Sequence, residues 1–130
     1  MKGAPKVGTS NEVTFVVEPQ HTIEFAGDGM PAVLSTPNLI QILERTARQS
    51  LLPFLDGGER SVGVEVEIRH LAPVPVGKSV TCATRVIRVE GREISFHIEA
   101  RDEQEVIARG AHKRHVIRVE RFAARVKQKA

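Results

Sequence analysis

The chain has 130 residues, of which 41% are hydrophobic and 27% are charged, and this composition excludes a disordered protein. No apolar run approaches the roughly 20 residues that span a bilayer, and the N-terminal segment lacks the apolar core of a signal peptide. The single cysteine, Cys82, excludes an internal disulfide and a cysteine-based zinc cluster. We therefore expect one domain, residues 1–130, in the cytoplasm, with neither a metal nor a membrane as partner.

The net charge of +3 is spread along the chain, and only the C-terminal tail concentrates it, through Arg121, Arg125, Lys127 and Lys129. Proteins that bind single-stranded nucleic acid need aromatic side chains on which bases stack. This chain has five Phe, no Trp and no Tyr, so we do not expect a nucleic acid partner. A small anionic ligand that carries phosphates agrees equally well with the mild positive charge.

The first elements are short. Residues 11–17 (NEVTFVV) alternate and are rich in β-branched side chains, which predicts a strand, and residues 21–25 (HTIEF) predict a second short one. Residues 26–32 contain Gly and Pro and predict a loop. This loop leads into the most strongly patterned segment of the chain.

Residues 36–52 predict an amphipathic helix of about 17 residues, roughly 25 Å long. It begins with Thr36 as a hydroxyl N-cap and Pro37 at the first helical position, and Pro53 ends it. Glu44 lies within the apolar stripe. Burial of a carboxylate is costly unless a cation or a hydrogen-bond donor compensates it. Two interpretations stay open: Glu44 reaches solvent or pairs with Arg48 one turn on, or it belongs to a site.

After residue 60 the hydrophobic pattern changes to period two, which predicts strands at 61–71, 79–90, 93–102 and 105–119, followed by a short helix at about residues 120–128 with Phe122, Ala123 and Val126 inward. In the first of these strands Val62, Val64, Val66 and Ile68 share one face, and His70 shares it too. Short turns make neighbouring strands antiparallel, and one apolar face needs one cover. The predicted class is therefore α+β, a hot-dog fold in which a long antiparallel sheet wraps around one central helix.

Several motifs together resemble the hot-dog-fold acyl-CoA thioesterases, and within them the fluoroacetyl-CoA thioesterase-like subfamily. They are Thr36, Glu44, the strand SVGVEVEIRH with Gly63 and His70, the PxPxG loop after it, the hairpin VEGREISFHIEARD, and the ending HKRHVIRVERFAARVKQK.

The resemblance implies an acyl-CoA thioesterase that hydrolyses a short or medium acyl-CoA to a free acid and coenzyme A. It implies Thr36, Glu44 and His70 as the catalytic group, the Gly63 N–H as a contact for the thioester oxygen, and a homodimer. No cofactor is expected, because coenzyme A is part of the substrate. The alternative is a non-catalytic acyl-CoA-binding hot-dog protein. A hot-dog hydratase is a third candidate, but its short motif with paired Asp and His is not found.

The spacing of these residues limits how they act. Thr36 and Glu44 are eight positions apart, roughly 12 Å along a helix, so they cannot touch within it. Either the substrate spans them, or the Thr of one subunit meets the Glu of its partner. Strand alternation puts His70 on the helix side, where we expect it to approach Glu44. Each residue also has an ordinary explanation: Thr36 as a cap, His70 as a surface hydrogen-bonding group, and Gly63 as a point of close packing.

Two further expectations concern the ends of the substrate. The subfamily carries an aromatic lid ahead of the helix, whereas the segment AGDGMPAVLS here is short and has Met30 as its bulkiest side chain. The sequence therefore does not assign which acyl group the protein accepts. The phosphates of coenzyme A need cations, and the candidates are Arg45, Arg48, Arg60, Arg69 and Lys78.

Overall fold

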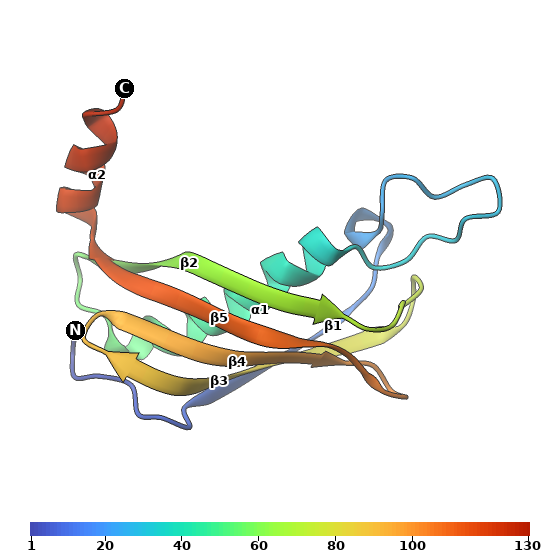
Figure 1. The fold of residues 1–130 in the computed structure, drawn as a ribbon, viewed down its shortest axis with the longest axis horizontal. Helices are drawn as coiled ribbons and strands as arrows, with labels where there is room; N and C mark the ends of the chain where they lie inside the picture. The colour runs from blue at the N-terminus through green and yellow to red at the C-terminus, as the bar shows by residue number, and fades with distance from the viewer.

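One antiparallel sheet of five strands wraps around one long helix (Figure 1). The structure is a computed structural model and describes all of residues 1–130. The strands are β1 (Ser10–Val16), β2 (Glu59–His70), β3 (Ser79–Glu90), β4 (Glu93–Arg101) and β5 (Val106–Arg118), and the helices are α1 (Thr36–Leu51) and α2 (Val119–Lys127). Two 3-10 turns complete the chain, at Pro19–His21 and Leu52–Phe54.

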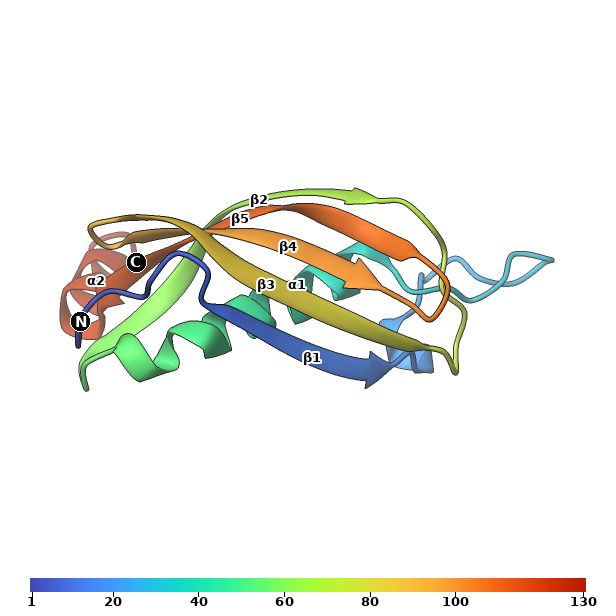
Figure 2. The same ribbon diagram turned by 90° about the horizontal axis from the view of Figure 1, so that it is seen from below.

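The strands lie in the order β1-β3-β4-β5-β2. Strands β3, β4 and β5 follow one another as hairpins, and the first turn uses Gly91 at a φ of 59°, in the region that favours glycine. Strand β2 does not pair with β3, its successor in sequence, but with β5 at the far side of the sheet. The two edges of the sheet are therefore β1 and the longer β2 (Figure 2).

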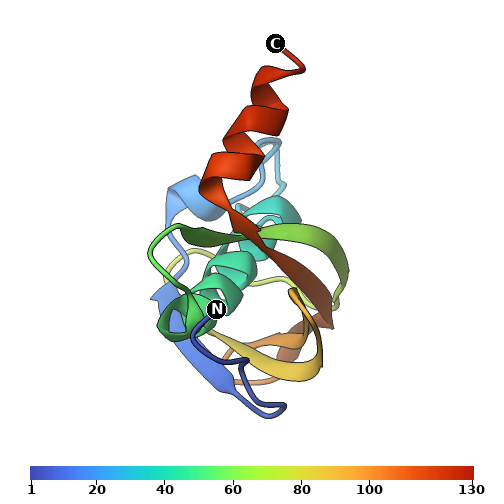
Figure 3. The same ribbon diagram turned by 90° about the vertical axis from the view of Figure 1, so that its left-hand side faces the viewer.

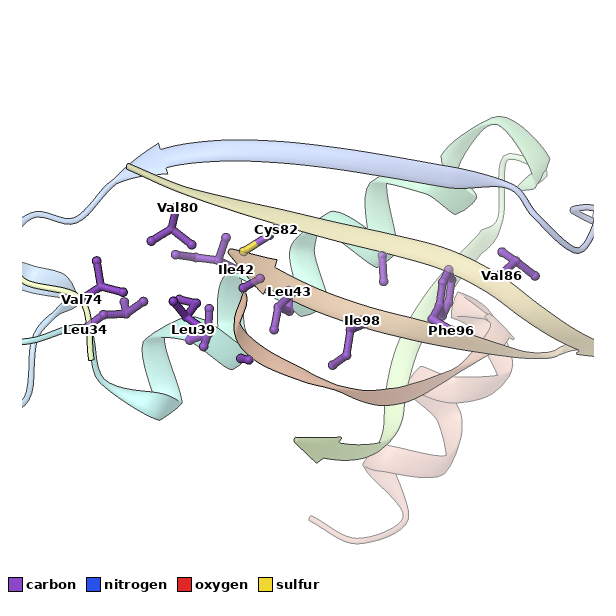
Figure 4. Close-up of a cluster of buried hydrophobic side chains, with 14 of the residues drawn as sticks. Leu34, Leu39, Ile42, Leu43, Val74, Val80, Cys82, Val86, Phe96 and Ile98 are labelled. Carbon is purple, nitrogen blue, oxygen red and sulfur yellow. The ribbon is translucent and has the colours of Figure 1, made fainter. Parts of the chain in front are cut away.

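The core lies between α1 and the inner face of the sheet (Figure 4). The helix buries Leu39, Ile42, Leu43, Thr46, Ala47 and Leu51. Cys82 on β3 is fully buried in this core, and burial raises the pKa of its thiol to about 12. Cys82 is therefore a packing residue of the core.

The predicted strand at residues 21–25 is wrong. The chain makes a 3-10 turn at Pro19–His21, one isolated bridge between Thr22 and Leu34, and then an extended loop closed by hydrogen bonds between Gly27 and Met30. This loop projects from the body of the fold (Figure 2). It leaves the side chain of Phe25 67% exposed.

The predicted apolar face of β2 is also wrong in part. A β-bulge between Gly63 and Glu65 makes Val64 an extra residue in the pairing with β5. A bulge shifts the alternation by one position, so residues before and after it reach the same face from opposite parities. Gly63 and Val66 face α1, because their partners on β5 are the buried Arg114 and His112, whereas Val64 is 57% exposed.

The C-terminal helix forms as predicted but buries none of its residues. Phe122 and Val126, which we expected to face inward, are 43% and 55% exposed. Helix α2 projects away from the end of the sheet (Figure 3). Neither helix is long and apolar enough to cross a membrane.

Candidate functional site

The Thr36 hydroxyl does not cap helix α1. Ser35, not Thr36, is the N-cap: its Oγ accepts a hydrogen bond from the Asn38 N–H at 3.2 Å. Thr36 and Pro37 therefore occupy the first helical turn, where Pro is well tolerated. The predicted cap was one residue too late, and the hydroxyl of Thr36 is available for another partner.

That partner is His70, at the end of β2. The Thr36 Oγ1 and His70 Nδ1 atoms are 2.8 Å apart, and we call these two side chains the hydroxyl–imidazole pair. Burial lowers the pKa of His70, which keeps the imidazole neutral at neutral pH. Its Nε2 is buried without a hydrogen-bond partner in the chain. A neutral imidazole within hydrogen-bond distance of a hydroxyl is the arrangement that activates a nucleophile.

An apolar cavity of about 320 Å³ opens at the hydroxyl–imidazole pair. Besides Thr36 and His70, its lining residues are Ile23, Phe25, Met30, Val33, Leu34, Leu71, Ala72 and Pro73. The sequence pointed to Met30 as the bulkiest side chain of this segment, but the structure adds Phe25, because the predicted strand that would have carried Phe25 elsewhere does not form. The cavity combines an apolar lining with one polar pair, as small-molecule sites commonly do.

Glu44 lies on α1, eight positions after Thr36, and its side-chain partners differ from those expected. Its Oε2 is 3.3 Å from Arg114 Nη1 and 4.0 Å from His112 Nε2, both on β5. Neither Arg48 nor His70 is an ion-pair partner of Glu44, so the expectation that His70 approaches Glu44 is wrong within one chain. The compensating cation is Arg114, and the side chain of Glu44 stays 38% exposed.

Hydrogen bonds to Ser61 and His112 fix the guanidinium group of Arg114. Its Nε donates to Ser61 Oγ at 2.8 Å, and its Nη2 donates to the Ser61 carbonyl at 2.9 Å. Its Nη1 also lies 3.2 Å from His112 Nε2, while His112 Nδ1 lies 2.8 Å from the Glu65 carbonyl. The carbonyl requires a proton on Nδ1, so Nε2 accepts from Arg114 and His112 is neutral. Burial lowers the pKa of both Arg114 and His112.

Gly63 belongs to the same group because of its missing side chain. A Cβ atom at this position would collide with Glu44 Oε2 and press on the His112 ring. The position therefore requires glycine for the carboxylate to lie where it does. We call Glu44, Gly63, His112 and Arg114 the carboxylate cluster.

The structure thus divides the predicted residues into two groups. Thr36 and His70 meet at the start of α1, and Glu44 and Gly63 meet at its middle. Sequence analysis missed His112 and Arg114, although one signal was present: they alternate with the buried Val116 on β5, which puts two polar side chains on an inner face. No three His, Cys, Asp or Glu side chains lie together as a metal site would require.

Comparison with known proteins shows which family the chain resembles. The family profile described as "Fluoroacetyl-CoA-specific thioesterase" matches residues 17–120. A fluoroacetyl-CoA thioesterase from Streptantibioticus cattleyicolor is 34% identical over 137 residues, covering 99% of this chain and 97% of the relative.

Two solved structures show the same fold. A variant of the fluoroacetyl-CoA-specific thioesterase, in complex with fluoroacetate and CoA, superposes with a TM-score of 0.84 at 32% identity, covering 91% of this chain and 99% of that one. A hot-dog-like protein from Thermanaerovibrio acidaminovorans superposes with a TM-score of 0.88 at 28% identity, covering 95% and 91%. The predicted hot-dog fold is confirmed.

Proposed function

The chain belongs to the fluoroacetyl-CoA-specific thioesterase family of thioester hydrolases, and on that premise we propose that it hydrolyses a short or medium acyl-CoA thioester to a free acid and coenzyme A. The observation that carries the proposal is the hydroxyl–imidazole pair at the mouth of an apolar cavity. The cavity takes the acyl group, and its opening puts the thioester carbon beside the Thr36 hydroxyl.

In the first step His70 acts as a base. Its neutral Nδ1 takes the proton of Thr36 while Oγ1 bonds to the thioester carbon, and the carbon–sulfur bond then breaks to release the thiolate of coenzyme A. A thiol ionises near a pH of about 8.5, so this leaving group needs no strong general acid. The N–H of Gly63, which comes with Glu44 from a second copy of the chain, holds the oxygen that gains negative charge.

In the second step Glu44 activates water. The carboxylate takes a proton from water as the water oxygen bonds to the acyl carbon. The bond to Thr36 then breaks, Oγ1 recovers the proton held by His70, and Glu44 releases its own proton to solvent. Arg114, fixed by Ser61 and His112, holds the carboxylate in place.

The two groups come together in a homodimer. Glu44 is eight positions along α1 from Thr36, so the carboxylate that serves one hydroxyl–imidazole pair is supplied by a second copy of the chain. Edge strand β2 offers the surface for this pairing, because Val64 is 57% and Val66 36% exposed on it. An edge strand with exposed apolar side chains tends to pair with another chain.

A panel of acetyl-, butyryl- and hexanoyl-CoA, followed with a thiol reagent, tests the activity. We expect thiol release with at least one substrate, and a loss of about 10²-fold or more in Glu44→Ala, as for other general bases. Glu67→Gln, which changes an exposed acid on β2, is the matched control. Intact-mass analysis of Glu44→Gln after a single turnover should show an acyl adduct on Thr36.

The main competing function is a non-catalytic acyl-CoA-binding protein. Saturable binding of acyl-CoA with no thiol release would establish it and overturn the hydrolase proposal. Hydrolysis by Glu44→Gln without an acyl adduct would instead reject the covalent route and leave Thr36 as a donor to the thioester oxygen.

A further inference from the structure

His112 is the titratable member of the carboxylate cluster that takes no part in the proposed proton transfers. Its side chain is 1% exposed. Its ring stacks on the ring of Phe96, with the centroids 6.0 Å and the planes 26° apart. Phe96 is fully buried, so the core fixes the plane of the imidazole independently of the other members of the cluster.

One nitrogen of His112 contacts the β-bulge of β2. Its Nδ1 donates to the carbonyl of Glu65 at 2.8 Å, and Glu65 directly follows the extra residue, Val64. On the other side of the bulge is Gly63, where a Cβ atom would lie 3.2 Å from Cε1 of the imidazole. The ring therefore lies against both flanks of the bulge. Because a bulge disrupts the strand ladder locally, a bond from the facing strand limits how far this part of β2 can shift.

The other nitrogen of His112 contacts the arginine that binds Glu44. Nη1 of Arg114 lies 3.2 Å from His112 Nε2 and 3.3 Å from Glu44 Oε2. This nitrogen carries two hydrogens in the guanidinium plane, so His112 accepts one and leaves the second for the carboxylate. Ser61 accepts from the remaining Nε and Nη2 atoms. The bond to His112 is therefore the third contact that fixes the guanidinium plane.

We propose that His112 is a positioning residue that places two reacting groups at once: the Gly63 N–H, through the β-bulge, and the Glu44 carboxylate, through Arg114. This inference rests on the proposed function, in which both groups act on the acyl group at Thr36 of a second copy. Reacting groups need to be held within about 0.5 Å of their productive positions. The Nδ1 contact thus serves formation of the acyl adduct, and the Nε2 contact serves its hydrolysis.

Two amide substitutions separate the two contacts. In His112→Asn the amide takes the place of Nδ1 and keeps a donor for the Glu65 carbonyl, but Arg114 loses its acceptor. In His112→Gln the longer side chain takes the place of Nε2 and keeps an acceptor for Arg114, but the Glu65 carbonyl loses its donor. The matched controls are His115→Asn and His115→Gln, because His115 lies on the same strand and alternates with the buried Arg114 and Val116.

Single-turnover kinetics with acyl-CoA, combined with intact-mass analysis, give the first test. His112→Asn should form the acyl adduct within about twofold of the wild-type rate but hydrolyse it about tenfold or more slowly, so that the adduct accumulates. His112→Gln should form the adduct about tenfold or more slowly and accumulate none, because a displaced oxyanion contact slows both steps. The His115 variants should react as the wild type does. Equal slowing of both steps by both His112 variants, or wild-type kinetics in both, overturns the proposal.

Hydrogen exchange followed by NMR tests the same placement without turnover. His112→Gln should speed exchange of the backbone amides of residues 63–66 about tenfold and leave the Nε–H of Arg114 as in the wild type. His112→Asn should do the reverse, because it loses the other hydrogen bond. The same spectra report whether each variant is folded. Loss of the folded state in both variants would assign His112 to the core alone and overturn the proposal.

The two measurements distinguish this inference from the proposed function. If the wild type hydrolyses no acyl-CoA but the exchange rates divide as described, the hydrolase function fails while His112 still positions the bulge and Arg114. If the wild type hydrolyses acyl-CoA and exchange rises alike at both places in both variants, the positioning role fails and the hydrolase function stands.

Discussion

Burial prepares His70 for proton transfer at neutral pH. The imidazole faces α1, and desolvation lowers its pKa below the ordinary value of about 6.5. Thr36 Oγ1 lies 2.8 Å from His70 Nδ1, and in the tautomer with its proton on Nε2 this nitrogen accepts the hydrogen bond of the hydroxyl. His112 is likewise kept neutral by burial, but its two nitrogens are both occupied, so of these two imidazoles only His70 is free to take a proton from substrate chemistry.

The lowered pKa has a consequence for folding stability. Below a pH of about 6.5 the unfolded chain binds protons at these histidines that the folded protein does not, so stability is complete above this pH and falls as the pH drops toward the folded-state pKa values. Each histidine contributes at most about 1.4 kcal/mol per pH unit within this window.

We therefore expect the free energy of unfolding, measured with urea between pH 7.5 and 5, to decline more steeply in the wild type than in His70→Gln. His97→Gln, which changes an exposed imidazole on β4, should keep the wild-type slope. The acid limb of kcat/KM for acyl-CoA should have its midpoint below about pH 6.5. A midpoint above this value would contradict a desolvated His70 as the base.

At the scale of elements, the start of α1 gives two adjacent hydroxyls different hydrogen-bond partners. Ser35 Oγ accepts from the backbone of Asn38, whereas Thr36 Oγ1 contacts only His70. The Ser35 hydroxyl is thus occupied by capping, whereas the Thr36 hydroxyl is available for the reaction that we propose.

This division predicts opposite behaviour of two neighbouring variants. Ser35→Ala should lower the free energy of unfolding by about 1 kcal/mol, because it removes an N-cap. Thr36→Ala should cost less stability but lower kcat by about 10²-fold or more, since it removes the proposed nucleophile. Thr36→Ser, which keeps the hydroxyl, should recover activity. Urea unfolding and thiol release measure the two effects, and a larger loss of stability in Thr36→Ala than in Ser35→Ala would return the cap to Thr36.

The strands show how far hydrophobic pattern alone determines the fold. The predicted bounds of β3, residues 79–90, are those of the structure, because alternation and flanking turns both mark them. The even-numbered valines of β2 alternate without interruption, yet the bulge at Val64 turns part of them outward. The bulge arises in the pairing of β2 with β5, so the sequence of β2 alone does not predict it.

Two other features depend on contacts distant in sequence. The spacing of Phe122 and Val126 predicts an amphipathic helix correctly, but it does not show whether the apolar stripe meets the core. No local pattern distinguishes Arg114 from the other basic residues, and its place beside Glu44 follows from the register of β5 against β2. The residues of the site could therefore be predicted in part from motifs, whereas their partners could not.

At the scale of the whole molecule, the distance between the two groups decides how the site is assembled. One chain brings Thr36 to His70 and Glu44 to Arg114, but it does not bring these pairs to each other. In the homodimer that we propose, a two-fold pairing of edge strand β2 supplies each hydroxyl–imidazole pair with a carboxylate from the second copy. In that arrangement every dimer has two sites, and each site uses both chains.

Mixing two inactive variants tests this arrangement. Thr36→Ala and Glu44→Ala, unfolded together and refolded at equal amounts, should recover roughly a quarter of wild-type activity, because half of the dimers are mixed and each mixed dimer has one intact site. The same variants refolded separately and then assayed together without exchange are the control and should stay inactive. If Glu44 instead served Thr36 of its own chain through an extended substrate, every site in the mixture would lack one group, and refolding together would recover nothing.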